Sequence, residues 1–423
     1  MNKNAIAAIS GIIFESYNNT LYGFFAVILA PIFFPPNEYL SSISASFLVF
    51  AAGYLARPIG GIVLGFIGDR FGRKRALLLS VLLTTVPTFI IGVLPSYASI
   101  GILAPILLVS CRLVQGVAIG ADYTGAIIYI AEQNGIKNKN FVTSILVAMG
   151  FFGAALGLIV SLLFSLISIT DWGWRCSFIF GSVVGIVICF MRLKMEESSA
   201  YQETKKKNLL EKNPIMSTFR SDKKQLAASC ILGGANLVPI YLATVYMNVH
   251  LKNLVGLSTQ AILIDNLVIF LIGGILVLFS SKLITRFTEI NIMNVCMYWF
   301  IFLSIPLYTW SFTNLSIMSL FIIQGFLIIG DAFQISALAI FLPKLFPSSR
   351  RYSGIGFSYS LGQAILGGTT PLVASMLVEK TGQTAAPSYF LCLIAILYLA
   401  AITIVKRTIT SEPSKEELPA EQN

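Results

Sequence analysis

Ionisable side chains interrupt several stretches of this sequence that are otherwise apolar. The ones that could do chemistry there are Glu15, Arg57, Arg112, Asp122 and Asp331. A charged group is costly in the hydrocarbon of a membrane, so such residues pair with one another or line a cavity. A carboxyl group can take up and release a proton, and a guanidinium can bind a carboxylate through two hydrogen bonds. These residue types therefore predict proton transfer and the binding of an anionic group.

The first apolar stretch carries a polar stripe made of Glu15, Asn18, Asn19 and Tyr22. Spacings of three, four and seven residues place these side chains on one face of a helix. We predict that this face lines a cavity, with Glu15 as a proton carrier and the other three as ligands of a solute. Arg112 is the expected partner of Glu15, either in a fixed pair or as a competitor for a carboxylate. Interhelical hydrogen bonding without transport chemistry is the alternative.

Two polar pairs recur at one spacing in the two halves of the chain. Gln115 and Asp122 are seven residues apart, and Gln324 and Asp331 repeat that spacing at an offset of 209 residues. The repeat predicts two similar halves related by an axis along the membrane normal. We predict Gln115 and Gln324 as substrate ligands and Asp122 and Asp331 as proton sites. The alternative for Asp122 is a structural partner, and the alternatives for Asp331 are a substrate contact or no part in proton or substrate binding.

Three further side chains are candidates for substrate recognition. Arg57 stands before Pro58 in the second apolar stretch, where it could anchor an anionic group or pair with carbonyls that the proline frees. Tyr241 and Tyr246 lie in the seventh stretch. Their rings could gate a cavity or hold a quaternary ammonium, and core packing is the alternative. We predict all three as substrate-binding residues.

Composition sets the class of fold that must position these residues. The chain has 423 residues, of which 56% are hydrophobic and 11% charged, and its mean hydropathy is +0.82. This excludes a soluble enzyme, a nucleic-acid-binding domain and a disulfide scaffold, since soluble domains carry about 25% charged residues. A membrane helix needs about 20 apolar residues. We predict an all-α integral membrane protein with twelve transmembrane helices, at residues 5–34, 42–68, 76–95, 101–131, 142–168, 175–192, 226–251, 260–281, 291–312, 316–343, 353–378 and 387–405.

Basic residues orient these helices. If Lys3 is cytoplasmic, 24 of the 29 Lys and Arg fall in or beside cytoplasmic segments and only three in outer loops. By the positive-inside rule we expect a multi-pass protein of the cell (inner) membrane with both termini cytoplasmic. The longest polar segment divides the chain into two six-helix bundles. The expected division is an N-terminal bundle 1–192, a cytoplasmic loop 193–225, a C-terminal bundle 226–405 and a disordered cytoplasmic tail 406–423.

The turn after the second stretch reads Gly-Phe-Ile-Gly-Asp-Arg-Phe-Gly-Arg-Lys over residues 65–74. Gly65 permits close helix packing, Gly72 permits a tight turn, and Asp69 can pair with basic groups or cap a neighbouring helix. The pattern resembles the signature loop of the major facilitator superfamily. That resemblance implies that Asp69, Arg70 and Arg73 latch one conformational state.

Other segments narrow the resemblance to the metabolite:proton symporter family, whose members carry proline/betaine, 2-oxoglutarate, citrate or shikimate. The matching segments are residues 53–61, 112–116, 345–354 and 367–371. There are two departures from the family pattern. Glu-Trp-Tyr-Asp-Phe of the family is Glu-Ser-Tyr-Asn-Asn here, so that Asn18 replaces an aspartate, and Gly-Gly-Glu is Gly-Ala-Asp at 120–122. These changes leave proton coupling and the substrate open.

We therefore expect a secondary active transporter, not an enzyme, that takes up a small carboxylate-bearing or zwitterionic metabolite with protons by alternating access. The alternatives are an uncoupled uniporter or exchanger of the same solutes, an exporter of amphipathic compounds, and a membrane sensor or lipid-modifying enzyme. The sequence has no phosphate-binding GxxxxGK[ST] motif, which disfavours an ATP-driven pump. With one His and no ligand cluster, we expect no metal or cofactor. The expected partners are a small solute, protons and the lipid bilayer, without nucleic acid, and a monomer is the expected functional unit.

Overall fold

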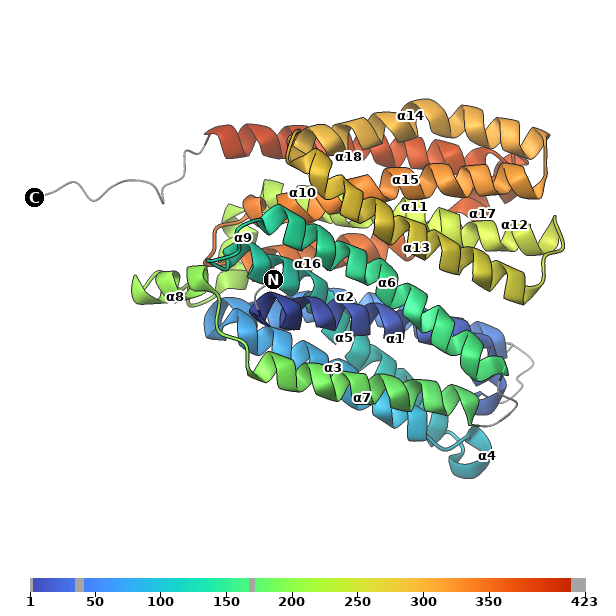
Figure 1. Cartoon of the computed structure of the whole chain (residues 1–423), viewed down its shortest axis with the longest axis horizontal. Coiled ribbons are helices and arrows are strands. Elements are labelled where there is room, and N and C mark those ends of the chain that lie inside the picture. Colours follow the sequence, from blue (N-terminus) through green and yellow to red (C-terminus); the bar gives the residue numbers. More distant parts are fainter. Residues whose placement is uncertain (1–2, 35–41, 167–171, 412–423) are drawn as a thin grey trace, which may run out of the picture.

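The computed structural model of the chain describes residues 3–34, 42–166 and 172–411, and these contain helices but no strand. The long helices run side by side along the longest axis of the molecule (Figure 1). The helices before the central polar segment form one group and those after it form a second group, which lies beside the first.

The N-terminal half contains six long helices and one short one. They are α1 (Lys3–Phe33), α2 (Ser42–Phe71), α3 (Arg73–Val93), α4 (Tyr97–Ile100), α5 (Leu103–Glu132), α6 (Lys139–Leu166) and α7 (Gly173–Leu193). The reversal between α2 and α3 takes one residue, Gly72, whose φ of +114° is strained for any residue with a Cβ.

The C-terminal half also has six spans, but three of them are built from several segments. The first combines α10 (Lys223–Ala235), α11 (Leu237–Tyr241), the π-helical turn η1 (Leu242–Tyr246) and α12 (Met247–Asn253). The next three are α13 (Thr259–Ile284), α14 (Glu289–Thr313) and α15 (Ile317–Phe341), and a 3-10 turn η2 (Leu342–Leu345) extends the last. The final two spans are α16 (Arg351–Gly362) with the π turn η3 (Gln363–Gly367) and α17 (Thr370–Thr381), followed by α18 (Ala386–Ser411).

Ten of these spans are long and apolar enough to cross a membrane, and α1 and α2, of 31 and 30 residues, bring the number to twelve. The predicted all-α fold with twelve membrane helices is confirmed. Predicted and observed bounds agree within a few residues, except that α18 continues to Ser411, beyond its expected end at residue 405. Most of the predicted disordered tail, from residue 412 on, lies outside the described residues.

Contact between the halves is close where α2 packs on α16. A Cβ placed on Gly61 would lie 2.2 Å from the backbone oxygen of Gly356, and one on Gly65 would lie 2.8 Å from the Cα of Ser353. Larger residues cannot occupy these positions without separating the helices. A second contact joins α6 to α13, where a Cβ on Gly273 would lie 2.7 Å from the ring of Phe151.

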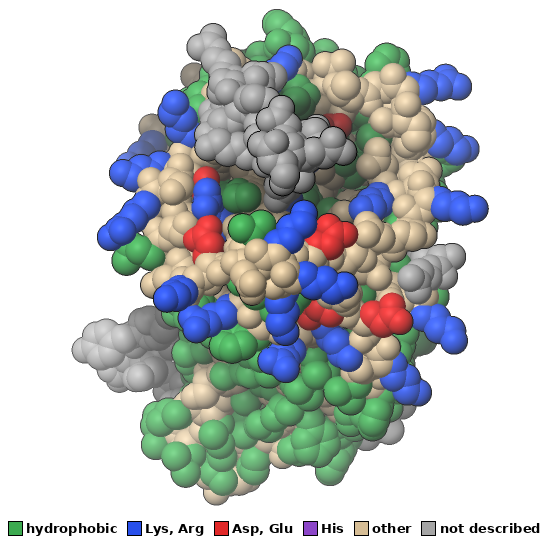
Figure 2. Space-filling view, turned by 90° about the vertical axis from the view of Figure 1, so that its left-hand side faces the viewer, with side chains coloured by type: hydrophobic (Ala, Val, Ile, Leu, Met, Phe, Trp, Pro, Cys, Tyr) green, Lys and Arg blue, Asp and Glu red, His purple; other side chains and the backbone are tan. Residues whose placement is uncertain are grey.

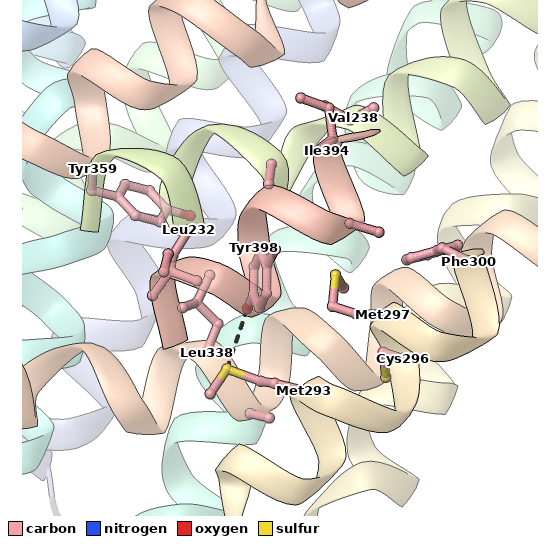
Figure 3. Packing of buried hydrophobic residues seen from close by; sticks show 14 of the residues in the cluster. Leu232, Val238, Met293, Cys296, Met297, Phe300, Leu338, Tyr359, Ile394 and Tyr398 are labelled. Atoms are coloured by element: carbon pink, nitrogen blue, oxygen red, sulfur yellow. Dashed lines mark hydrogen bonds between the residues drawn. The ribbon is translucent and has the colours of Figure 1, made fainter. Parts of the chain in front are cut away.

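The C-terminal half has its own apolar core. Figure 3 shows the side chains of α10, α14, α15 and α18 that meet there, Leu232, Met293, Leu338 and Tyr398 among them. The hydroxyl group of Tyr398 donates to the sulfur of Met293 at 3.2 Å, which satisfies the polar end of a fully buried ring.

The central polar segment, which was predicted as a loop, contains two short helices, α8 (Ser199–Lys206) and α9 (Pro214–Ser221). The side chains of Ser198 and Asn213 cap their N-termini, and Pro214 suits the first helical position. Sequence reasoning missed these helices because they are polar and too short to show a periodic pattern. Figure 2 shows Lys and Arg side chains gathered on the end of the molecule that carries α8 and α9.

Candidate functional site

A cavity of about 210 Å³ lies between the two halves. It is smaller than the roughly 300–1,000 Å³ typical of pockets for drug-sized ligands, so it suits a small solute. The polar residues lining it are Glu15, Ser16, Asn19 and Thr20 of α1, Tyr54 and Arg57 of α2, Tyr123 of α5, Asn236, Tyr241, Thr244, Asp331 of α15, Tyr359 of α16 and Gln363.

The cavity holds an unusual set of charges. Glu15 comes from the N-terminal half and Asp331 from the C-terminal half, and Arg57 is the single guanidinium among the described lining residues. Within the described part of the chain, no hydrogen-bond donor reaches Glu15 Oε2 or Asp331 Oδ1, although both atoms are buried. Both atoms can therefore accept a hydrogen bond from a ligand in the cavity.

Arg57 bridges the two halves. Its Nη1 donates to Oε1 of Gln363 at 3.0 Å, and its Cζ lies 3.6 Å from the centroid of the Tyr54 ring. The side chain is buried. The π face and the amide oxygen hold the guanidinium in place without neutralising it, so it keeps the ability to bind an anion.

Tyrosines form much of the remaining wall. The hydroxyl groups of Tyr54 and Tyr241 are hydrogen-bonded to each other across the halves, and Asn19 Nδ2 donates to the Tyr54 hydroxyl at 3.3 Å. The rings of Tyr123 and Tyr359 are stacked with centroids 5.8 Å apart. Such a wall offers both π faces for a cationic group and hydroxyl groups for a polar one.

One end of the molecule is closed by contacts of the loop at residues 65–74. Asp69 accepts hydrogen bonds from the backbone amides of Tyr352 at 3.1 Å and Ser353 at 2.7 Å, at the start of α16 in the other half. A carboxylate at a helix N-terminus also interacts favourably with the helix dipole. Arg73 pairs with Asp69 at 3.1 Å and with Glu132 at 2.9 Å.

Further contacts extend this closure. Arg73 Nη2 donates to the carbonyl of Ser348 in the C-terminal half at 2.6 Å, and Arg351 pairs with Glu132 at 2.9 Å. Arg70 Nη1 donates to the carbonyl of Lys212 in the central segment at 2.6 Å. The structure therefore brings together Gly65, Asp69, Arg70, Gly72 and Arg73 at one joint between the halves.

The sequence profile of the Major Facilitator Superfamily matches residues 9–330. The chain belongs to this superfamily. It is 30% identical to the citrate-proton symporter of Klebsiella pneumoniae, over 94% of this chain and 90% of that protein. It is 31% identical to the proline/betaine transporter of Salmonella typhimurium, over 99% of this chain and 86% of that protein.

Solved structures of the proton:xylose symporter XylE share the major facilitator fold with this chain. The structure bound to 6-bromo-6-deoxy-D-glucose superposes with a TM-score of 0.80 at 14% identity, covering 95% of this chain and 94% of the other. For the inward open conformation of XylE from E. coli the TM-score is 0.65 at 15% identity, with 95% of each chain covered. A major facilitator is a membrane transporter and not an enzyme, and the chain is a multi-pass membrane protein.

The polar stripe of α1 in this major facilitator divides between two environments. Glu15 and Asn19 line the cavity, whereas Asn18 faces α3 and accepts a hydrogen bond from Thr88 at 2.9 Å. Tyr22 lies about 10 Å further along the helix axis than Glu15, since each residue rises 1.5 Å. Its ring is 4.0 Å from Cζ of Arg112. Spacing alone predicted that all four side chains line one cavity, but Asn18 contacts α3 and Tyr22 contacts α5 instead.

The structure does not bring Arg112 to Glu15 as predicted. Arg112 Nη1 donates to Oε1 of Gln115 at 2.9 Å, and Gln115 Nε2 donates to Thr88 at 2.9 Å. Neither Arg112 nor Gln115 is among the cavity residues. The guanidinium that shares the cavity with Glu15 is that of Arg57.

Asp122 has the structural partner that was the alternative to a proton site. Its Oδ1 lies 2.5 Å from Nη1 of Arg192 and accepts from the hydroxyl of Ser80, also at 2.5 Å. Arg192 donates to the backbone carbonyls of Ala7, Ala8 and Leu77 as well. Sequence reasoning had only counted Arg192 among the basic residues in or beside cytoplasmic segments. Its position at the end of an apolar stretch was a signal, but nothing in the pattern named its partner.

Of the predicted functional residues in the C-terminal half, two line the cavity and two lie outside it. Tyr241 and Asp331 line the cavity, but Gln324 donates to Asp265 Oδ2 at 2.8 Å and to the carbonyl of Ala243 at 3.0 Å. Tyr246 packs edge-on against His250 with centroids 4.7 Å apart. Neither residue contributes to the cavity.

Eight polar cavity residues were missed, namely Ser16, Thr20, Tyr54, Tyr123, Asn236, Thr244, Tyr359 and Gln363. Tyrosine is common in packed helices, so the three-dimensional arrangement was needed to find the ring pair. Gln363 and Asn236 could have been found as amides within apolar spans, as Gln115 and Gln324 were.

Proposed function

We propose that this protein is a proton-coupled importer of a small zwitterionic solute, one that joins a carboxylate to a cationic nitrogen as proline and betaine do. The observation that carries the proposal is the charge set of the cavity, in which Arg57, stacked on Tyr54, shares the lining with two carboxyl groups and further tyrosines. The alternating-access motion is a rocking of the bundles 1–192 and 226–405 about this cavity, joined by the segment 193–225.

Each end of such a solute finds a complement. A carboxylate is attracted to Arg57, and a cationic nitrogen to Asp331, Glu15 and the tyrosine rings. A tricarboxylate would add three negative charges to a cavity that has two carboxyl groups and one guanidinium among its described lining residues. This balance favours the solutes of the proline/betaine transporter over that of the citrate-proton symporter, the two relatives that otherwise match about equally.

Glu15 is the proposed proton carrier and Asp331 the second site. Both carboxyl groups reach the cavity, and each keeps an oxygen without a donor in the described structure. Asp122 lies within electrostatic range of Glu15 and would bias its proton affinity, with Arg112 holding the adjoining part of α5. Asn19, Arg57 and Tyr241 are the proposed ligands. The other predicted ligands would then support the cavity-lining residues without touching the solute; they are Asn18, Tyr22, Gln115, Tyr246 and Gln324.

Membrane placement is part of the proposal. The basic end shown in Figure 2 faces the cytoplasm of the cell (inner) membrane, so that both termini lie there and the closed latch is cytoplasmic. The unit of transport is one chain, because the cavity is built entirely within it, and no nucleic acid takes part. Reporter fusions at both termini and cross-linking in the membrane test these points.

The test is proton flux in proteoliposomes with an internal pH dye. Glycine betaine, proline, 2-oxoglutarate, citrate and shikimate are added in turn, each against buffer alone. Acidification with a zwitterion, lost in Glu15→Gln and kept in Glu289→Gln, is the expected result. Glu289 is a suitable control because it forms a surface pair with Lys344 at 2.6 Å.

Other outcomes discriminate the alternatives. Uptake of labelled zwitterion without acidification would identify an uncoupled uniporter or exchanger and would connect the loss of coupling to Asn18. Acidification with citrate alone would refute the argument from the charge set. Transport of none of these solutes would refute the proposal and favour an exporter of amphipathic compounds.

A further inference from the structure

Two π-helical turns interrupt the C-terminal half, each next to a residue of the cavity. In η1 the amide of Met247 donates to the carbonyl of Leu242, and in η3 the amide of Gly368 donates to the carbonyl of Gln363 at 2.9 Å. Hydrogen bonds that span five residues are rare and occur mostly as single turns at functional sites. The outer segments α12 and α17 follow these two turns.

One stacked pair of α2 contacts both turns. Tyr54 is hydrogen-bonded to the hydroxyl group of Tyr241, the residue that precedes η1. Arg57, one helical turn later, donates to the side chain of Gln363, the first residue of η3, at 3.0 Å. Cζ of Arg57 lies 3.6 Å from the centroid of the Tyr54 ring. Movement of either side chain therefore affects both hydrogen bonds, the one to Tyr241 and the one to Gln363.

The turns are also coupled to each other by packing. A Cβ on Gly367 of η3 would lie 2.6 Å from the side chain of Leu237 in α11, the segment that leads into η1. A Cβ on Gly368 would lie 3.8 Å from the Tyr54 ring. A shift of either turn therefore acts on the other and on Tyr54.

A substrate carboxylate and the Gln363 side chain would compete for the same donor. Gln363 offers Arg57 a single neutral amide oxygen, whereas a carboxylate offers a negative charge and two oxygens, so it can form the bidentate ion pair that the amide cannot. Once Gln363 is displaced, η3 loses its anchor on α2. Conversion of a π turn to α-helix changes the register by one residue, which turns the following segment by about 100° and moves it by about 1.5 Å.

We infer that Gln363 is the residue that a substrate carboxylate displaces from Arg57, and that this exchange releases η1 and η3 and so resets the outer segments α12 and α17. Gln363 is a positioning residue in this scheme. The inference rests on the proposed function, because it names the group through which the carboxylate end of the solute acts.

The test combines hydrogen exchange with binding, on the full chain in lipid nanodiscs. Peptides over residues 242–247 and 363–368 are followed by mass spectrometry without solute. Gln363→Met removes the acceptor and should speed exchange about tenfold or more in both segments, as expected for loss of a hydrogen bond to a charged donor. Tyr54→Phe should speed it in the first segment more than in the second. Gln334→Met, a buried glutamine of α15 outside the cavity, is the control.

Binding supplies the second readout. Glycine betaine should reproduce the faster exchange in the wild-type protein and add nothing in Gln363→Met. Gln363→Glu places a carboxylate permanently on Arg57 and should raise the Kd for betaine at least tenfold. Unchanged exchange in solute-free Gln363→Met, or an unchanged Kd in Gln363→Glu, would overturn the inference.

The two proposals fail in different ways. If the wild-type protein binds citrate or 2-oxoglutarate but no zwitterion, the proposed substrate is wrong, and the Gln363→Glu titration with the solute that binds still decides the exchange. If none of the solutes binds, the exchange with a carboxylate is refuted together with the proposed function, even where solute-free Gln363→Met shows faster exchange.

Discussion

Replacing Asp69 by Asn should open the closed end of the molecule. The Asp69 carboxylate accepts two backbone hydrogen bonds, at 3.1 and 2.7 Å, from the first residues of α16 in the other half. Hydrogen bonds to a charged group contribute about 1.5–3 kcal/mol each, and charge at a helix N-terminus contributes about 0.3–1 kcal/mol more. An Asn side chain keeps one acceptor and loses the charge. The expected loss is about 2–4 kcal/mol, which is roughly a 30- to 700-fold shift toward the open state.

The assay follows a thiol that only opening exposes. Ser360 is buried on α16 and donates to the carbonyl of Gly120 in the other half at 2.7 Å, so Ser360→Cys reports separation of the halves. In a background without the six native cysteines, the labelling rate with a membrane-impermeant maleimide should rise at least tenfold when Asp69→Asn is added. Arg73 keeps its pair with Glu132, so the fold of the N-terminal half should survive.

Glu379→Gln is the matched control, because this carboxylate is exposed on α17 and far from the latch. Labelling in Asp69→Asn equal to that of the control would refute the reasoning. It would mean that Asp69 shapes the loop without linking the halves. An equal rise from both sides of the membrane would mean unfolding, which a thermal melt of the same sample detects.

Three further perturbations have defined outcomes. Arg192→Gln should lower the free energy of unfolding by about 3–5 kcal/mol, because it leaves the buried Asp122 carboxylate unpaired; thermal unfolding in detergent checks this, and the double variant with Asp122→Asn should recover part of the loss. Asn18→Asp puts an ionisable group in the Thr88 contact and should raise the number of protons moved per solute, as the ratio of proton to labelled-solute flux; an unchanged ratio would exclude Asn18 as the site where coupling differs. Burial raises the pKa of Glu197, although its carboxylate accepts hydrogen bonds from the amides of Ser198, Lys74 and Arg73. Because the pKa of Glu197 is higher in the folded than in the unfolded protein, the contribution of this residue to stability falls as the pH rises through the raised pKa. Thermal melts from pH 4 to 8 should show that fall in the wild-type protein and not in Glu197→Gln.

The fold was predictable because membrane helices are set by length and hydropathy. Each predicted span lies within a few residues of an observed one, and the loop at residues 65–74 was predicted from its complete motif. Pairing of Asp69 with a basic group and capping of a neighbouring helix were both predictable, because each is a short-range contact of one carboxylate. What hydropathy could not predict was the break of two C-terminal spans by π turns, since a π turn leaves no trace in composition.

The candidate site was predictable only in part, because the sequence does not show which helices pack against one another. Glu15, Asn19, Arg57, Tyr241 and Asp331 line the cavity, but the pairing of Glu15 with Arg112 was wrong. Sequence spacing fixes which residues share a helix face and says nothing about which neighbouring helix meets that face. Partners from distant spans, such as Arg192 for Asp122 and Gln363 for Arg57, therefore had to come from the structure.

The buried charges divide into two groups with different consequences for the transport cycle. Asp122 and Arg192 lie inside one half and are satisfied by each other, by a hydroxyl group and by backbone carbonyls, so a rocking motion of the halves leaves them intact. Glu15, Arg57 and Asp331 line the cavity between the halves, and Arg57 donates to Gln363 of the other half, so relative motion of the halves would break that hydrogen bond. Only the second group can couple binding to motion, because a ligand shifts a conformational equilibrium by the difference in its affinity for the two states. If the proposed function is correct, the oxygens of Glu15 and Asp331 that have no donor in the described structure are the atoms available to a proton or a solute in one conformation.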